Sequence, residues 1–207
     1  MKKLTQKLIL GLLLVTMASC AQVFYALDAR SLAMKHQTIA IIPPTISIAA
    51  QRKVDAEAIR EQQRTESMNF QSEMYSWLLR RKMQGHFSQD IQDIQTTNAK
   101  LQEVDYPYRP LTTAQLCELL GVDGIITSNF ALSKPMSTGA AIAVAVLFGA
   151  AGSTNEVRGT ISVSDCQNTK LIWNYEHRVS GGLGSSPASV VNAFMRRASK
   201  KMPYRVR

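Results

Sequence analysis

The sequence contains none of the short motifs that commonly mark a catalytic or metal centre. Its three histidines, His36, His86 and His177, are scattered, with no H-E-x-x-H motif and no paired C-x-x-C motif. No G-x-S-x-G motif is present, and no lysine follows the glycines of 181–184 as a phosphate-binding loop requires. We therefore predict no metal, no cofactor and no enzymatic activity, and keep an unrecognised cell-wall enzyme as an alternative.

Two carboxylates and two tryptophans remain as candidate site residues. Glu73 falls in a predicted long helix and Asp123 at the start of a predicted strand. No acid–base partner can be assigned to either from the sequence, and Asp123 is interpreted as serving its local turn. Trp77 and Trp173 are interpreted as core residues rather than as a platform for a ligand.

The sequence also lacks an apolar run long enough to span a bilayer as a helix. A lysine-rich start is followed by an apolar segment at 8–17 and then by Ala18-Ser19-Cys20. About ten apolar residues rise only ~15 Å as a helix, whereas a bilayer core needs ~20 residues. This order of charged, apolar and small residues predicts a secretory signal.

The end of this segment resembles the bacterial lipoprotein signal, in which a small residue precedes a cysteine. The resemblance implies cleavage between Ser19 and Cys20 and a lipid on Cys20, which anchors the protein to a membrane. The alternative is an ordinary secreted protein in which Cys20 is incidental. Ala21 and Gln22 follow, and neither is the aspartate linked to inner-membrane retention in enterobacteria. We therefore expect a location in the bacterial cell envelope, at the outer membrane.

Length and composition then predict the organisation of the mature chain. Residues 1–19 are the signal, 20–36 are expected to form an irregular tether, and 37–207 are expected to form one domain. A hydrophobic content of 45% is enough for a packed core. The net charge of +9 includes three lysines of the signal. A basic exported protein suits anionic surfaces such as lipid headgroups rather than nucleic acid, although a solvated basic surface is the alternative.

Besides Cys20, the chain has only Cys117 and Cys166. The two can pair in an oxidising periplasm. However, Cys117 lies in an apolar helical pattern typical of a small core residue, and Cys166 lies in a predicted turn. The sequence therefore favours unpaired cysteines without deciding the question.

Hydrophobic periodicity predicts an α/β (α+β) fold with a single mixed β-sheet and packed helices. The expected order is strand, helix, strand, helix, strand, insertion, two-stranded hairpin, helix. The predicted strands are one from 38 that is ended by the double proline at 43–44, and others at 88–95, 122–130, 155–164 and 170–179. The predicted helices lie at 53–84, 96–104, 112–120 and from 187 onward.

An apolar insertion rich in glycine and alanine is predicted at 139–152. Its fully apolar part, 139–149, is too short to span a bilayer as a helix. Three alternatives stay open: a helix packed in the domain or at a self-association surface, a contact with a membrane surface, and a hairpin of an oligomeric barrel. As a strand, it would place Ile142, Val144, Val146 and Phe148 on one face.

Three segments together resemble a group of bacterial envelope lipoprotein domains. They are Ile39-Ala40-Ile41-Ile42-Pro43, the helix-to-strand step Leu119-Leu120-Gly121-Val122-Asp123-Gly124-Ile125-Ile126, and Leu171-Ile172-Trp173 before the final helix. The group includes the amino-terminal domain of the Tol system's periplasmic protein, the lipoprotein activators of penicillin-binding proteins, and the curli secretion lipoprotein. The resemblance covers about residues 38–200.

The resemblance implies a non-catalytic binding or scaffold module that acts through envelope protein partners. The alternative is a membrane-associated homo-oligomer, or a secretion or pore component, that uses the 139–152 insertion. No functional residue is transferred position by position.

Overall fold

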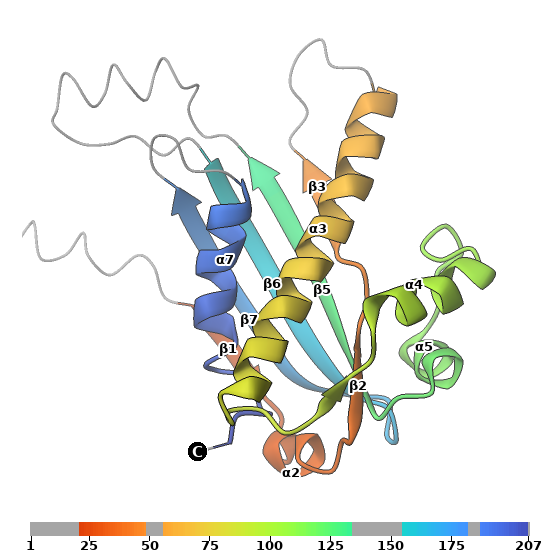
Figure 1. The fold of residues 1–207 in the computed structure, drawn as a ribbon, viewed down its shortest axis with the longest axis vertical. Helices are drawn as coiled ribbons and strands as arrows, with labels where there is room; N and C mark the ends of the chain where they lie inside the picture. Colours follow the sequence, from red (N-terminus) through yellow and green to blue (C-terminus); the bar gives the residue numbers. More distant parts are fainter. Residues whose placement is uncertain (1–20, 49–55, 134–154, 182–186, 207) are drawn as a thin grey trace, which may run out of the picture.

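The computed structural model describes residues 21–48, 56–133, 155–181 and 187–206, which form one sheet with helices packed against it (Figure 1). The elements along the chain are β1 (Gln22–Tyr25), α2 (Ala29–Ala33), β2 (Thr38–Ile41), β3 (Thr45–Ile48), α3 (Ala56–Met83), β4 (Asp90–Ile91), α4 (Ile94–Glu103), α5 (Thr113–Leu120), β5 (Gly124–Ser133), β6 (Asn155–Asp165), β7 (Lys170–Gly181) and α7 (Pro187–Ala198).

The sheet is mixed, as the sequence predicts. Its seven strands follow the order β1-β7-β6-β5-β2-β4, and β3 also pairs with β5. The strands β2, β3 and β4 make only parallel pairings, whereas β5, β6, β7 and β1 form an antiparallel run. The predicted α/β class with a single mixed sheet is therefore confirmed.

The main core lies between the sheet and the pair α3 and α7, which cross the same face in Figure 1. Successive side chains of a strand point to opposite faces, so alternate residues of β2 and β6 face these helices. The buried residues of this core include Ile39, Ile41, Phe70, Met74, Leu78, Phe130, Ile161, Val163, Trp173, Phe194 and Met195.

A second, smaller core lies beneath α4 and α5. Ala40, Ile42 and Ile125 pack there, in alternation with the residues of β2 and β5 that face the main core. Helix α5 begins with a capping box between Thr112 and Gln115, and it ends at Gly121, which is left-handed with a φ of 67°. These two signals place α5 where the sequence predicts a helix, and α5 in turn carries Cys117.

Two sequence-based expectations about the fold are wrong, those on the tether and on Trp77. The segment expected to be an irregular tether contains β1 and α2, and β1 pairs with β7 over the whole strand. The strand β2 ends at Ile41, before the two prolines, as the sequence predicts, and a further strand, β3, begins directly after them. Trp77 is only half-buried, and its Nε1 donates a hydrogen bond to Asn192.

None of the helices in the described segments is both long and apolar enough to cross a bilayer.

Candidate functional site

The structure leaves several predicted site residues undescribed. Cys20 and the insertion residues Ile142, Val144, Val146 and Phe148 lie outside the described residues. Their roles therefore remain predictions. The candidate site that the structure does describe lies elsewhere, at the end of the sheet where β2 and β5 begin.

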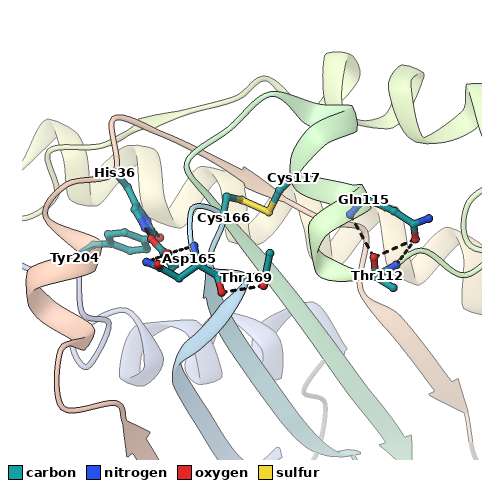
Figure 2. The surroundings of a disulfide bond; sticks show 9 residues. His36, Thr112, Gln115, Cys117, Asp165, Cys166, Thr169 and Tyr204 are labelled. Carbon is teal, nitrogen blue, oxygen red and sulfur yellow. Dashed lines mark hydrogen bonds and ion pairs between the residues drawn. A yellow bond between two sulfur atoms is a disulfide. The ribbon is translucent and has the colours of Figure 1, made fainter.

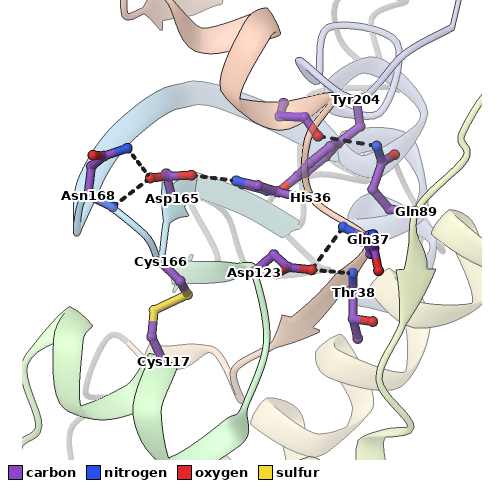
Figure 3. Close-up of polar contacts among 11 residues, drawn as sticks. His36, Gln37, Thr38, Gln89, Cys117, Asp123, Asp165, Cys166, Asn168 and Tyr204 are labelled. Atoms are coloured by element: carbon purple, nitrogen blue, oxygen red, sulfur yellow. Dashed lines mark hydrogen bonds and ion pairs between the residues drawn. A yellow bond between two sulfur atoms is a disulfide. The ribbon is translucent and has the colours of Figure 1, made fainter.

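A buried polar cluster of His36, Asp165 and Tyr204 occupies this end of the sheet (Figure 3). The Nε2 atom of His36 lies 2.8 Å from Oδ1 of Asp165, and its Nδ1 atom lies 2.9 Å from the hydroxyl of Tyr204. An ionised carboxylate only accepts hydrogen bonds, so Nε2 of a neutral His36 carries the proton and Nδ1 accepts from Tyr204. The cluster joins the start of β2, the end of β6 and the segment after α7.

The second oxygen of Asp165 is satisfied as well. Oδ2 accepts hydrogen bonds from the backbone nitrogen of Asn168 at 2.8 Å and from its side-chain nitrogen at 2.9 Å. Burial alone would raise the pKa of Asp165, but the hydrogen bonds from His36 and Asn168 outweigh it and lower that pKa. Asp165 is therefore held as a carboxylate that fixes the turn between β6 and β7.

Tyr204 completes the cluster as a neutral hydroxyl. It is fully buried, and this burial, followed by the nearby carboxylates of Asp165 and Asp123, raises its pKa far above the usual value. Each ring nitrogen of His36 thus makes a hydrogen bond to a buried side chain, Nε2 to Asp165 and Nδ1 to Tyr204. Tyr204 is fully buried and does not line the pocket described below, so the proton between its hydroxyl and Nδ1 of His36 is out of reach of a substrate. We therefore interpret His36, Asp165 and Tyr204 as a structural link between three segments and call it the latch.

Asp123 ties two strands together beside this latch. The sequence favours a local role for its carboxylate, but Oδ2 accepts hydrogen bonds from the backbone nitrogens of Gln37 and Thr38, at 2.9 and 2.8 Å. These residues precede and begin β2, whereas Asp123 immediately precedes β5. The expectation of a purely local role is therefore wrong. Glu73, the other candidate carboxylate, is half-buried on α3 and does not line the pocket described below.

Gly124 makes the close approach of His36 and Tyr204 possible. A Cβ atom at this position would lie 2.5 Å from Nδ1 of His36 and 2.8 Å from the hydroxyl oxygen of Tyr204. Both distances are shorter than any real Cβ contact of this kind. Because Gly124 has no side chain, His36 and Tyr204 can pack directly against the backbone of β5.

A disulfide between Cys117 and Cys166 joins α5 to the residue that follows β6 (Figure 2). The sequence favours unpaired cysteines, and this expectation is wrong. Cys117 does lie on the buried face of α5, but that face meets the β6–β7 turn as well as the sheet. The bond closes a loop across a sequence separation of 49 residues.

The latch and the disulfide lie at an open pocket of about 610 Å³. Its lining includes His36 and Asp165 from the latch, both cysteines, and charged residues of both signs. The charged residues beyond the latch are Lys35, Glu118 and Asp123. Because hydrogen bonds and a covalent bond fix several lining residues, the pocket is preformed rather than assembled on binding.

A second buried histidine lies on the face covered by α7. Nε2 of His177 lies 2.6 Å from Nη1 of Arg197. Burial, and then the charges of Arg197 and Lys201, lower the pKa of His177 and favour its neutral form, which accepts from the guanidinium.

Within the described segments, no group of three or more His, Cys, Asp and Glu side chains is arranged to hold a metal ion.

Sequence reasoning missed the latch because its members are far apart in the chain. His36 is separated from Asp165 by 129 residues and from Tyr204 by 168. No local spacing connects them, and Tyr204 follows the last predicted helix. The only local signal is Asp165 before Asn168 in a turn, a pattern that predicts a turn and not a cluster.

Comparison with known proteins yields solved structures only. No family model and no curated protein matches the chain. The PelC dodecamer from Paraburkholderia phytofirmans matches 91% of this chain and 99% of its own, with 12% identity and a TM-score of 0.45. Lipoprotein GNA1162 from Neisseria meningitidis matches 79% of this chain and 96% of its own, with 8% identity and a TM-score of 0.42.

The LpoB C-terminal domain from Salmonella enterica matches 74% of this chain and 96% of its own, with 11% identity and a TM-score of 0.36. A protein named as a lipoprotein is thus among the solved structures to which this chain is similar. At such identities and TM-scores, we take no activity or partner from these proteins.

Proposed function

We propose that this protein is a lipid-anchored component of the bacterial envelope that works as a non-catalytic binding or scaffold module for protein partners. The observation that carries the proposal is Cys20 directly after Ser19, at the end of a charged and then apolar segment of signal length. The lipid on Cys20 holds the domain at the membrane. Since Ala21 and Gln22 follow the cysteine, the outer membrane is the proposed location.

The disulfide supports an exported location independently of the signal. Disulfides persist in oxidising compartments such as the periplasm and are rare in the reducing cytosol. The bond between Cys117 and Cys166 lies inside the fold and joins two of its elements. A protein that folds outside the cytosol can keep this bond, in agreement with removal of residues 1–19 during export.

The preformed pocket is the proposed site for a protein partner. Lys35 and Glu118 are exposed at the pocket and carry opposite charges. A polypeptide segment with charged and polar side chains is complementary to such a lining, and a rigid site loses little conformational entropy on binding. The full burial of Tyr204, which holds Nδ1 of His36, supports a structural role for this histidine rather than catalysis.

Photo-crosslinking in intact envelopes tests this binding role. A photoreactive residue at Lys35 or at Glu118 should give the same discrete adduct with an envelope protein. The matched control is Glu103, which is exposed at the end of α4 and does not line the pocket. Adducts of equal yield at all three positions, or none at the two pocket positions, would contradict a partner site in this pocket.

A second candidate function is a membrane-associated homo-oligomer or secretion component. The observation that favours it is the apolar run at 139–149. In the sheet, Ser133 pairs with Glu156, so residues 134–154 connect two neighbouring strand ends. On this proposal, Ile142, Val144, Val146 and Phe148 supply an apolar contact between copies or with a membrane.

Replacement of one central residue of the run tests this second candidate. Val144→Asp should dissociate an oligomer, because an unpaired charge in an apolar interface is costly. Ser153→Asp adds the same charge directly after the insertion and serves as the control. The mass of the detergent-solubilised protein is measured, and an unchanged mass in Val144→Asp would reject self-association through this run.

A further inference from the structure

The first described strand lies immediately after the predicted lipidation site. Strand β1 begins at Gln22, only two residues after Cys20. Two residues span at most ~7 Å of extended chain. A lipid on Cys20 would therefore hold β1 at the headgroup level. Because β1 is the edge strand of the sheet beside β7, this edge of the domain must lie at the membrane.

An open groove of about 580 Å³ lies against the end of β1. Tyr25 of β1 forms one part of its lining, and four cations surround it. These cations are Arg30, Lys200, Lys201 and Arg205, and all four are exposed. The groove thus combines an aromatic side chain with a concentrated positive charge at the edge that a lipid on Cys20 would bring to the membrane.

The sequence concentrates its positive charge in the same segment. After Glu176, the chain contains seven lysines and arginines and no aspartate or glutamate. These seven account for most of the net charge of +9, and three further lysines belong to the signal. The charge of the mature chain is therefore a local property of its last elements rather than a uniformly basic surface.

Specific contacts fix the backbone that carries these cations. The hydroxyl of Tyr25 donates to the carbonyl of Lys201 at 2.5 Å, and the backbone nitrogen of Val206 donates to the carbonyl of His86 at 3.1 Å. Between them, Tyr204 is fully buried and bonded to His36. Residues 200–205 are thus part of the folded domain and present their cations in a defined arrangement.

Exposed apolar side chains lie along the same edge of the domain, in β1 and the turn after it, with Phe24 on the opposite face of the strand from Tyr25. Phe24 is 51% exposed, Tyr25 is 49% exposed, and Leu27, in the turn that follows, is fully exposed. Aromatic side chains are favoured at the headgroup level of a bilayer, and basic residues beside them interact with anionic lipids. The combination of a single anchor, apolar residues and cations is that of a protein lying on a membrane surface.

We propose that this edge of the domain, formed by β1, Leu27 and the groove of Tyr25, Arg30, Lys200, Lys201 and Arg205, binds the phosphate headgroups of anionic phospholipids. This contact rests on the proposed anchor at Cys20 for its position in the cell and orients the domain on the membrane. Such a second contact restricts how the domain can turn about its anchor. The pocket at the start of β2 and β5 is then held in a fixed orientation to the bilayer.

Sedimentation with vesicles tests the proposal without the lipid. Residues 21–206 make every contact described above, so a chain of residues 21–207 retains the described fold. This chain should bind vesicles of phosphatidylcholine with phosphatidylglycerol and should not bind vesicles of phosphatidylcholine alone. Binding should weaken as salt is raised, because the attraction is screened.

Paired variants with equal charge identify the surface. Arg30→Gln with Lys200→Gln removes two cations of the groove and should weaken binding to the anionic vesicles roughly 10- to 30-fold. Arg60→Gln with Arg64→Gln removes two exposed cations of α3 and should leave binding within about twofold. Circular dichroism confirms that each pair is folded.

Three outcomes would overturn the proposal. They are equal losses in both pairs, equal binding to neutral vesicles, and no binding to the anionic vesicles. The assay uses a chain without Cys20, so it can fail while Cys20 is lipidated in cells. Conversely, vesicle binding can succeed if Cys20 carries no lipid, and the two proposals are therefore tested separately.

Discussion

The imidazole of His36 and the carboxylate of Asp165 form a buried pair, with 2.8 Å between Nε2 and Oδ1 and side chains that are 2% and 4% exposed. The pair joins the segment before β2 to the end of β6. Tyr204 extends it to the carboxyl-terminal segment through a hydrogen bond to the same imidazole. This latch therefore couples the site at the end of the sheet to the basic segment beside β1.

Removal of one partner of this pair should destabilise the whole domain. Asp165→Asn places an amide donor against the two donors of Asn168 that Oδ2 now accepts from, and leaving such buried groups unsatisfied costs roughly 1–3 kcal/mol of unfolding free energy. Urea denaturation measures the loss. Asp28→Asn is the control, because it removes the exposed ion pair with Lys170 and should leave stability nearly unchanged. A similar effect of both variants would show that the His36–Asp165 pair does not stabilise the fold.

The same pair predicts an acid limb in the stability profile. The pKa of Asp165 in the folded protein is lowered from its usual value of 3.8. The stabilisation is therefore complete above about pH 4 and is lost as the pH falls through the lower folded pKa. Asp165→Asn, compared with the parent chain between pH 2 and 6, should show a flatter acid limb. Parallel profiles for the two chains would mean that Asp165 ionises alike in the folded and unfolded states.

The disulfide should contribute substantially to stability. A bond across a separation of 49 residues restricts the unfolded chain, which corresponds to about 4 kcal/mol in the chain-entropy model. Cys117→Ser with Cys166→Ser should unfold at lower urea concentration by that amount. The oxidised parent should also show no alkylation at either cysteine. Alkylation of both under non-reducing conditions would contradict the pairing.

Gly124 offers a test of how closely the latch packs against β5. Gly124→Ala places a methyl group against Nδ1 of His36 and the hydroxyl of Tyr204, and such overpacking costs roughly 1–3 kcal/mol. Ser133→Ala, at the exposed end of the same strand, should change stability by less than ~0.5 kcal/mol. Thermal unfolding compares the two variants. If Gly124→Ala is as stable as the parent chain, His36 and Tyr204 do not pack against residue 124 as closely as the structure shows.

Local chemistry explains which parts of the fold could be predicted. The helix α5 is bounded by Thr112 and Gly121, whose preferences act over a few residues, and the sequence predicts both ends. The hairpin of β6 and β7 could be predicted because apolar and polar residues alternate along both strands, which have 11 and 12 residues. Strong and continuous signals of this kind need no knowledge of the tertiary structure.

The parts that could not be predicted depend on contacts between distant segments. The strand β1 has only four residues, too short a run to show alternation, and it is held in the sheet by pairing with β7. Cys117 has the same apolar pattern whether it packs as a thiol or bonds to Cys166, so spacing alone could not decide the pairing. His36, Asp165 and Tyr204 likewise meet only after the sheet has formed. The candidate site is accordingly less predictable than the fold.

The mass of the intact protein isolated from membranes tests the central proposal most directly. A lipid-anchored envelope protein should lack residues 1–19 and carry acyl groups on Cys20, and Cys20→Ala should be unprocessed or released to the soluble fraction. The measured mass should include residues 22–25, which form β1, in both the parent and the Cys20→Ala protein. A parent protein with an unmodified Cys20, or one that retains residues 1–19, would contradict the account.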